Sequence, residues 1–207
     1  VLSGRESDNP EEFAGAVLER RRVPTEFRDV DRPILLYGGA TYQWFDRELF
    51  FELARARPEW TFALVGPPGE GLIGDGLPAN VLSLGRKGYD EFPHYVAACD
   101  AAIMPWRDDA ITRSADPINL YEYLLCGKPV VATPFPAALE REGLVRIAET
   151  ADAFESAIGE ALKENPSGPA AMARTEFGLS NTWEDRAQRA LALIEESRRS
   201  RLDAESG

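Results

Sequence analysis

Residues Asp116–Thr133, with the sequence DPINLYEYLLCGKPVVAT, give the clearest indication of how this chain folds. The first part has the pattern of a short helix, with Asp116 at the N-cap, Pro117 at the first helical position and Gly127 at the end. The run Pro129–Thr133 then follows, rich in β-branched residues and typical of a strand buried on both faces. A helix leading into such a strand is the repeating unit of a parallel α/β sheet.

The rest of the chain repeats this alternation. Five further apolar runs are bounded by turn-forming residues, at Pro33–Tyr37, Thr61–Gly66, Asn80–Leu84, Ala101–Pro105 and Val145–Ala148. Helical patterns follow most of them, at Asp46–Arg57 with Asp46 as N-cap, at Tyr89–Cys99, at Ala151–Lys163 and at Thr182–Arg198. We therefore predict an α/β fold: a Rossmann-like doubly wound parallel sheet of about six strands, with C-terminal helices.

Composition excludes several classes of protein. The 207 residues carry 23 Lys and Arg against 35 Asp and Glu, a net charge of −12, which argues against broad electrostatic binding to nucleic acid or anionic lipid. No apolar run reaches the roughly 18 residues of a membrane span, and no secretory signal is present, so we expect no transmembrane segment and a cytoplasmic location. Cys99 and Cys126 lie in apolar helical contexts and are expected to be buried thiols. His94 is the only histidine, so a His-rich metal site is not expected.

A ligand of such a sheet binds at the carboxyl ends of the strands where the strand order reverses. With the order 3-2-1-4-5-6, two loops meet there, Gly38–Trp44 and Trp106–Asp116. Both lead to a helix N-terminus, an arrangement that favours an anion such as a diphosphate. Gly38 and Gly39 would let backbone amides approach it, although the pair could also serve only to make a tight turn.

The helix that follows the second loop adds a carboxylate. Asn119 and Glu122 are three residues apart on one face of a mainly apolar helix. The two oxygens of a carboxylate match a ribose diol, although Glu122 could instead face solvent or pair with Lys128. Trp44, Trp106 and Tyr42 lie in the same two loops, either as platforms for a base or sugar or as packing residues.

One motif is misleading. Residues 69–74, GEGLIG, fit the dinucleotide pattern G-x-G-x-x-G, but the neighbouring prolines prevent a helix from starting there. A dehydrogenase is therefore disfavoured, and NAD binding would be the observation that revives it.

Several segments together resemble a known family. Asp116–Thr133 resembles the segment of GT-B glycosyltransferases of the group 1 (family 4) type in which a glutamate-bearing helix precedes a small-Gly-x-Pro-Val-Val strand. Pro78–Ala102 resembles their nucleotide-base segment, and Thr182–Ile194 their C-terminal helix. Ile34–Asp46 is similar to a bacterial subgroup that makes surface polysaccharides. The resemblance covers residues 1–195.

The resemblance implies a domain organisation. The family has an N-terminal acceptor domain and a C-terminal donor domain, and this chain resembles only the second. Val1–Phe13 resembles the segment between the two domains, and the chain begins without Met. We expect residues 1–30 to be a linker and lead-in, residues 31–197 the nucleotide-sugar donor-binding domain and residues 198–207 a frayed tail of a longer enzyme.

The resemblance also implies site residues. Glu122 matches the ribose-holding second glutamate of the E-x7-E pattern, Arg86 and Lys87 match the base-contacting pair, and Gly38 and Gly39 match the phosphate loop. The loop and helix start that embrace the diphosphate and sugar correspond to Ser114, Pro117, Ile118 and Asn119.

Three departures from the family pattern stand out. Ser114 replaces the first glutamate, Asn119 replaces a lysine of the subgroup, and the phosphate loop lacks its usual Arg and Lys. Neutralising the diphosphate would then fall to helix ends and to Arg113, Arg86 or Lys87.

The function implied is retaining, metal-independent hexosyl transfer from a UDP-type or GDP-type sugar, for surface polysaccharide or glycolipid synthesis. No cofactor is expected, the catalytic groups would come from the acceptor domain, and the isolated chain is expected to bind its donor without transfer. The full-length enzyme would be cytoplasmic or peripheral at the inner membrane. Two alternatives stay open, a degenerate donor domain that serves as an interaction module and a GT-B sugar-nucleotide epimerase.

Overall fold

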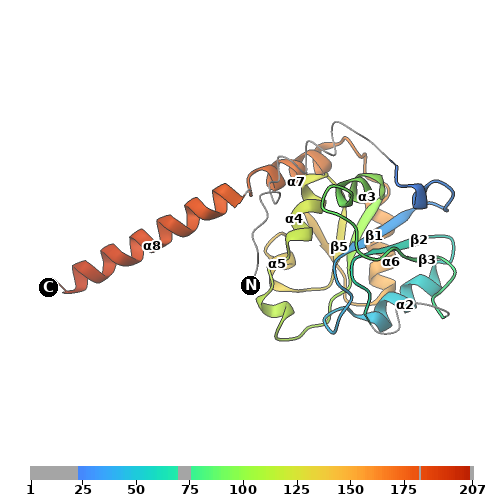
Figure 1. The fold of residues 1–207 in the computed structure, drawn as a ribbon, viewed down its shortest axis with the longest axis horizontal. Coiled ribbons are helices and arrows are strands. Elements are labelled where there is room, and N and C mark those ends of the chain that lie inside the picture. Colours follow the sequence, from blue (N-terminus) through green and yellow to red (C-terminus); the bar gives the residue numbers. More distant parts are fainter. Residues whose placement is uncertain (1–22, 70–75, 182, 206–207) are drawn as a thin grey trace.

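One parallel sheet forms the centre of the protein. A computed structural model describes residues 23–69, 76–181 and 183–205. Its strands lie in the order β3-β2-β1-β4-β5-β6, and every pairing is parallel (Figure 1). The strands are β1 Ile34–Gly38, β2 Thr61–Val65, β3 Val81–Ser83, β4 Ala101–Met104, β5 Val130–Ala132 and β6 Val145–Ile147. The prediction of a doubly wound sheet is confirmed, with the strand order reversing between β1 and β4.

Helices cover both faces of the sheet. On one face α2 packs against α6, and on the other α4 packs against α3 and α7 (Figure 1). The helices are α2 Arg47–Ala56, α3 Phe92–Ala98, α4 Ile118–Leu125, α5 Pro136–Leu139, α6 Ala151–Ala161, α7 Pro169–Leu179 and α8 Trp183–Glu205, with 3-10 turns η1 Thr25–Phe27 and η2 Thr112–Ser114. The last helix, α8, extends away from the sheet (Figure 1).

The core explains why the short strands are stable. All five residues of β1 and of β2 are buried, and α2 adds Phe50 and Leu53 from its apolar stripe. Full burial of one such side chain contributes roughly 1.5–3 kcal/mol. The N-cap prediction for α2 is confirmed, because the Asp46 carboxylate accepts a hydrogen bond of 3.1 Å from the Leu49 amide.

The N-cap predicted for α4 is wrong. The helix begins at Ile118 after Pro117, and no side chain caps it. The Asp116 carboxylate instead accepts a hydrogen bond of 2.8 Å from the Tyr121 hydroxyl, and Arg141 lies 3.4 Å from it. Gly127 does end the helix, with a φ of +66°.

Two further differences concern the C-terminal part. Helix α7 was not predicted, because its buried positions are Ala171, Arg174 and Gly178 rather than large apolar residues. The tail predicted to begin near residue 198 is helical through Glu205. The predictions for residues 1–22, for Thr182 and for most of the 69–74 motif fall outside the described residues.

The prediction of buried thiols is confirmed for Cys99, whereas Cys126 is partly buried. Both are free thiols. Burial raises the pKa of Cys99 to about 11 and raises that of Cys126 as well. Within the described ranges, no helix has the length and apolarity needed to cross a membrane.

Candidate functional site

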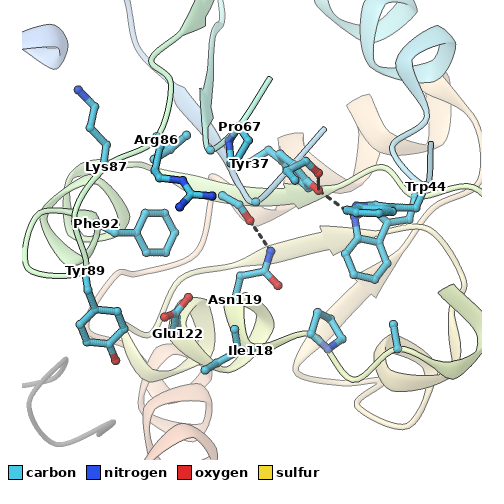
Figure 2. A pocket seen from close by; sticks show the side chains of 18 of the residues that line it. Tyr37, Trp44, Pro67, Arg86, Lys87, Tyr89, Phe92, Ile118, Asn119 and Glu122 are labelled. Carbon is cyan, nitrogen blue, oxygen red and sulfur yellow. Dashed lines mark hydrogen bonds between the residues drawn. The ribbon is translucent and has the colours of Figure 1, made fainter. Parts of the chain in front are cut away.

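A cavity of about 610 Å³ opens at the carboxyl ends of the strands, beside the reversal of strand order. Its walls come from the β1–α2 loop, the end of β2, the loop before α3, the β4–α4 loop and the start of α4 (Figure 2). The two loops predicted to meet at a ligand, residues 38–44 and 106–116, therefore both contribute to it.

The structure brings most of the predicted site residues to this cavity. The lining includes Gly38, Gly39, Arg86, Lys87, Pro117, Ile118, Asn119 and Glu122. Arg113 and Ser114 are not part of the lining. The guanidinium of Arg113 binds the carboxylate of Asp108 at 2.7 and 2.8 Å, and the Ser114 hydroxyl donates to the carbonyl of Ala110 at 3.3 Å.

The Gly38–Gly39 turn is held by the protein itself. The Gly38 amide donates to the Tyr123 hydroxyl at 2.6 Å, and the Gly39 amide donates to the Val65 carbonyl at 2.8 Å. The Asn119 side-chain amide donates to the Gly38 carbonyl (Figure 2). Both amides expected to approach a phosphate are thus already engaged. Gly39 has a φ of +145°, a conformation that requires glycine.

Helix α4 provides the open amides instead. Pro117 has no amide hydrogen, and the amides of Ile118 and Asn119 have no acceptor among the residues the structure describes. Both residues line the cavity, so a helix N-terminus faces it. The second predicted helix end, that of α2, is capped by Asp46 and is not part of the lining.

Two opposite charges face each other across the cavity. Figure 2 shows the Glu122 carboxylate on α4 and the Arg86 guanidinium on the facing loop, both directed into the space between them. Lys128 does not pair with Glu122, because its ammonium group donates to the carbonyls of Ala97 at 2.8 Å and Cys99 at 2.7 Å. Glu122 is half-buried rather than turned to bulk solvent.

The two cations predicted to contact the base differ in their partners. Arg86 is exposed, and its guanidinium makes no hydrogen bond or ion pair within the described part of the chain. Lys87 is half-buried and donates to the Glu26 carboxylate at 2.7 Å. Among the three predicted cations Arg86, Lys87 and Arg113, Arg86 is therefore the one whose charge is not paired within the described part of the chain.

Aromatic side chains form much of the remaining wall. Trp44 and Trp106 both line the cavity, and Tyr42 does not, since it packs edge-on against Trp44 at 5.4 Å between ring centroids. Trp106 is 8% exposed and donates to the Tyr37 hydroxyl at 3.2 Å. Trp106 therefore packs the two loops together. Burial raises the pKa of Tyr37 to about 12, so the Tyr37 hydroxyl stays protonated.

Sequence reasoning missed two residues that shape the site. Tyr123 lies one helical turn after Asn119, and that spacing is the signal that could have placed both on the face toward Gly38. Phe92 packs so close to Gly38 that a Cβ there would lie 2.3 Å from its ring. No local pattern signals that contact, because the two residues come from different elements.

An open parallel sheet with a cavity at the reversal of its strand order is the architecture of nucleotide-binding α/β domains. Residues 35–164, more than half of the chain, match the family model described as glycosyl transferases group 1. The chain belongs to this family.

One curated protein and two solved structures illustrate what this chain is similar to. The chain is 34% identical over 111 residues to the teichuronic acid biosynthesis glycosyltransferase TuaH of Bacillus subtilis (strain 168), covering 50% of this chain and 27% of that protein. Anabaena Alr3699/HepE, solved with UDP and glucose, has a TM-score of 0.60 at 20% identity, covering 87% of this chain and 52% of that chain. A UDP-forming α,α-trehalose-phosphate synthase from Burkholderia vietnamiensis has a TM-score of 0.62 at 15% identity, and the match covers 96% of this chain and 51% of that chain. These structures show the same fold, and the chain spans about a quarter to a half of each relative's length.

Proposed function

We propose that the cavity binds the nucleoside diphosphate sugar donor of a glycosyltransferase, of the UDP or GDP type. One observation carries the proposal. The Glu122 carboxylate lies one helical turn from the open amides of Ile118 and Asn119, and Arg86 faces them from the opposite wall. A carboxylate that fits a ribose diol therefore stands beside two kinds of group that fit a diphosphate.

Each group has a distinct task in this proposal. Glu122 accepts hydrogen bonds from both ribose hydroxyls and so fixes the nucleoside. The amides of Ile118 and Asn119, with the Arg86 guanidinium, stabilise the charge that grows on the diphosphate as it leaves the sugar. The resemblance to the family implies that transfer proceeds with retention and without a metal ion, and these donors and this cation would supply the electrostatic stabilisation.

The acceptor and the catalytic groups are assigned to an N-terminal acceptor domain of a longer enzyme. The name of TuaH, a glycosyltransferase of teichuronic acid biosynthesis, favours a surface polysaccharide or glycolipid as the product. Such an enzyme would work in the cytoplasm or at the inner face of the membrane, where nucleotide sugars are its donors. The isolated chain binds the donor and does not transfer the sugar.

Calorimetric titration of this chain with UDP, GDP, ADP and NAD tests the proposal. Glu122→Gln keeps the size of the side chain and removes its charge. Because a hydrogen bond to a charged group is worth about 1.5–3 kcal/mol, the affinity for the preferred nucleotide should fall at least about tenfold. Glu52→Gln is the matched control, since Glu52 is exposed on α2 and outside the cavity.

The outcomes separate a donor site from a dehydrogenase and from an interaction module. Binding of one nucleoside diphosphate that depends on Glu122 supports the donor site and identifies the base. Binding of NAD alone would contradict it. A correctly folded chain that binds no nucleotide would favour the interaction-module alternative.

A further inference from the structure

Two neighbouring cations at the mouth of the cavity point in different directions. Figure 2 shows the Arg86 guanidinium turned into the cavity and the Lys87 side chain turned away from it. They belong to the same loop, between β3 and α3, and both residues line the cavity. Which of them faces a ligand therefore depends on what holds this loop.

The holding contact comes from the lead-in before β1. Glu26, in the turn η1, accepts hydrogen bonds from the Lys87 ammonium group at 2.7 Å and from the Tyr95 hydroxyl at 2.8 Å. Both bonds reach the same carboxylate oxygen, and the Lys87 nitrogen lies 5.2 Å from the centroid of the Tyr95 ring. Lys87 is thus fixed by a charge, a hydrogen bond and a ring face together.

Glu26 is itself anchored in the core. The next residue, Phe27, is 3% exposed and packs edge-on against Tyr95, with 5.4 Å between ring centroids. The side chain of Lys87 is only 18% exposed and that of Glu26 only 32% exposed, so water screens the ion pair less than it screens a surface pair. The hydrogen bond from Lys87 lowers the pKa of Glu26 to about 2, and the same pairing raises the pKa of Lys87.

We propose that Glu26 is a positioning residue of the donor site, which holds Lys87 outward and thereby presents Arg86 to the donor diphosphate. This inference rests on the proposed function of the cavity. Glu26 touches neither the cavity nor Arg86, since neither the lining nor its hydrogen bonds include such a contact among the described residues. Its effect on a ligand therefore passes through Lys87 and the backbone that Lys87 shares with Arg86.

A double-mutant cycle on Glu26 and Arg86 tests the inference, with the dissociation constant of UDP or of whichever nucleoside diphosphate binds best as the readout. Glu26→Gln should weaken binding by about fivefold, because the loop loses its charged anchor. In an Arg86→Gln background the same change should alter affinity by less than about twofold, because the group it positions is gone. Glu160→Gln is the control, since it removes a more exposed ion pair, 2.6 Å long, between Glu160 near the end of α6 and Lys163, far from the cavity.

Two further variants separate positioning from general stability. Lys87→Met should reproduce the loss seen in Glu26→Gln, and the charge swap Glu26→Lys with Lys87→Glu should recover most of the affinity. A loss that persists in the Arg86→Gln background, or tighter binding by Glu26→Gln because Lys87 turns inward, would overturn the inference and leave the donor site intact. If the wild-type chain binds no nucleoside diphosphate, the proposed function fails and the inference fails with it.

Discussion

Tyr123 connects the stability of the fold to the shape of the site, and Tyr123→Phe tests this connection. The Tyr123 hydroxyl is fully buried, accepts the Gly38 amide at 2.6 Å and lies 3.3 Å from the Gly38 carbonyl. Burial raises the pKa of Tyr123 well above its ordinary value, so the hydroxyl keeps its proton and can donate. It therefore holds both polar groups at the end of β1, where the cavity begins.

The size of the effect follows from what the substitution leaves behind. Phenylalanine preserves the packing of the ring and removes only the oxygen, so the Gly38 amide becomes a buried donor with no acceptor. Leaving such a group unsatisfied costs about 1–3 kcal/mol. The Gly38 carbonyl stays satisfied by Asn119, so the cost should not exceed that range.

Urea unfolding of wild type and Tyr123→Phe measures this cost. Tyr42→Phe is the matched control, because Tyr42 is 47% exposed. Loss of its hydroxyl group should change the unfolding free energy by less than about 0.5 kcal/mol. Adding Asn119→Ala to Tyr123→Phe strips the Gly38 carbonyl as well, so the double variant should lose more than the sum of the single losses. A loss for Tyr123→Phe no larger than that of the control would refute the assignment of this hydroxyl as the anchor of Gly38.

Two other predictions concern helix packing and pH. Gly178→Ala should destabilise the fold by about 1–3 kcal/mol in urea unfolding, because its Cβ would lie 2.6 Å from the backbone of Leu125 on α4, whereas Gly159→Ala has open space and should not. The folded-state pKa of Glu26 is about 2 against an ordinary value of 4.5, so its ionised form stabilises the folded chain above pH 4.5 and that contribution is lost as the pH falls toward 2. The unfolding free energy of wild type should therefore fall more steeply with acid than that of Glu26→Gln, and equal slopes would contradict the ion pair.

The strands could be predicted because a strand buried on both faces has a local sequence that is apolar throughout. A strand covered by helices on both faces needs apolar residues at every position, and runs such as Thr61–Val65 show this without any knowledge of the partners. The alternation of helix and strand and the right-handed crossover rule leave few topologies, and the assumed order 3-2-1-4-5-6 is the one that the structure shows. Helix α7 gave no such signal, because Arg174 and Gly178 fill its buried face.

The cavity could be located from the sequence, and its polar contacts could not. Topology alone brings the ends of β1 and β4 together, so the loops around Gly38 and Trp106 had to meet. The hydrogen-bond partner of a polar group depends on side chains that are distant in the sequence. Asp116 had the position of a helix cap, yet it bonds to Tyr121 and lies beside Arg141, which comes from the end of α5.

The distribution of engaged and open amides narrows the expected position of an anion. The sequence predicted two places for the diphosphate, the Gly38–Gly39 turn and the start of α4, but the Gly38 and Gly39 amides already donate to the Tyr123 hydroxyl and to the Val65 carbonyl. Opening those bonds to a ligand would expose buried donors and acceptors of the core, at a cost of about 1–3 kcal/mol each. The α4 amides demand no such exchange, since Pro117 precedes them and no side chain caps them. A diphosphate in this cavity should therefore lie against α4, between its first turn and Arg86, where the protein already presents unsatisfied donors and a charge.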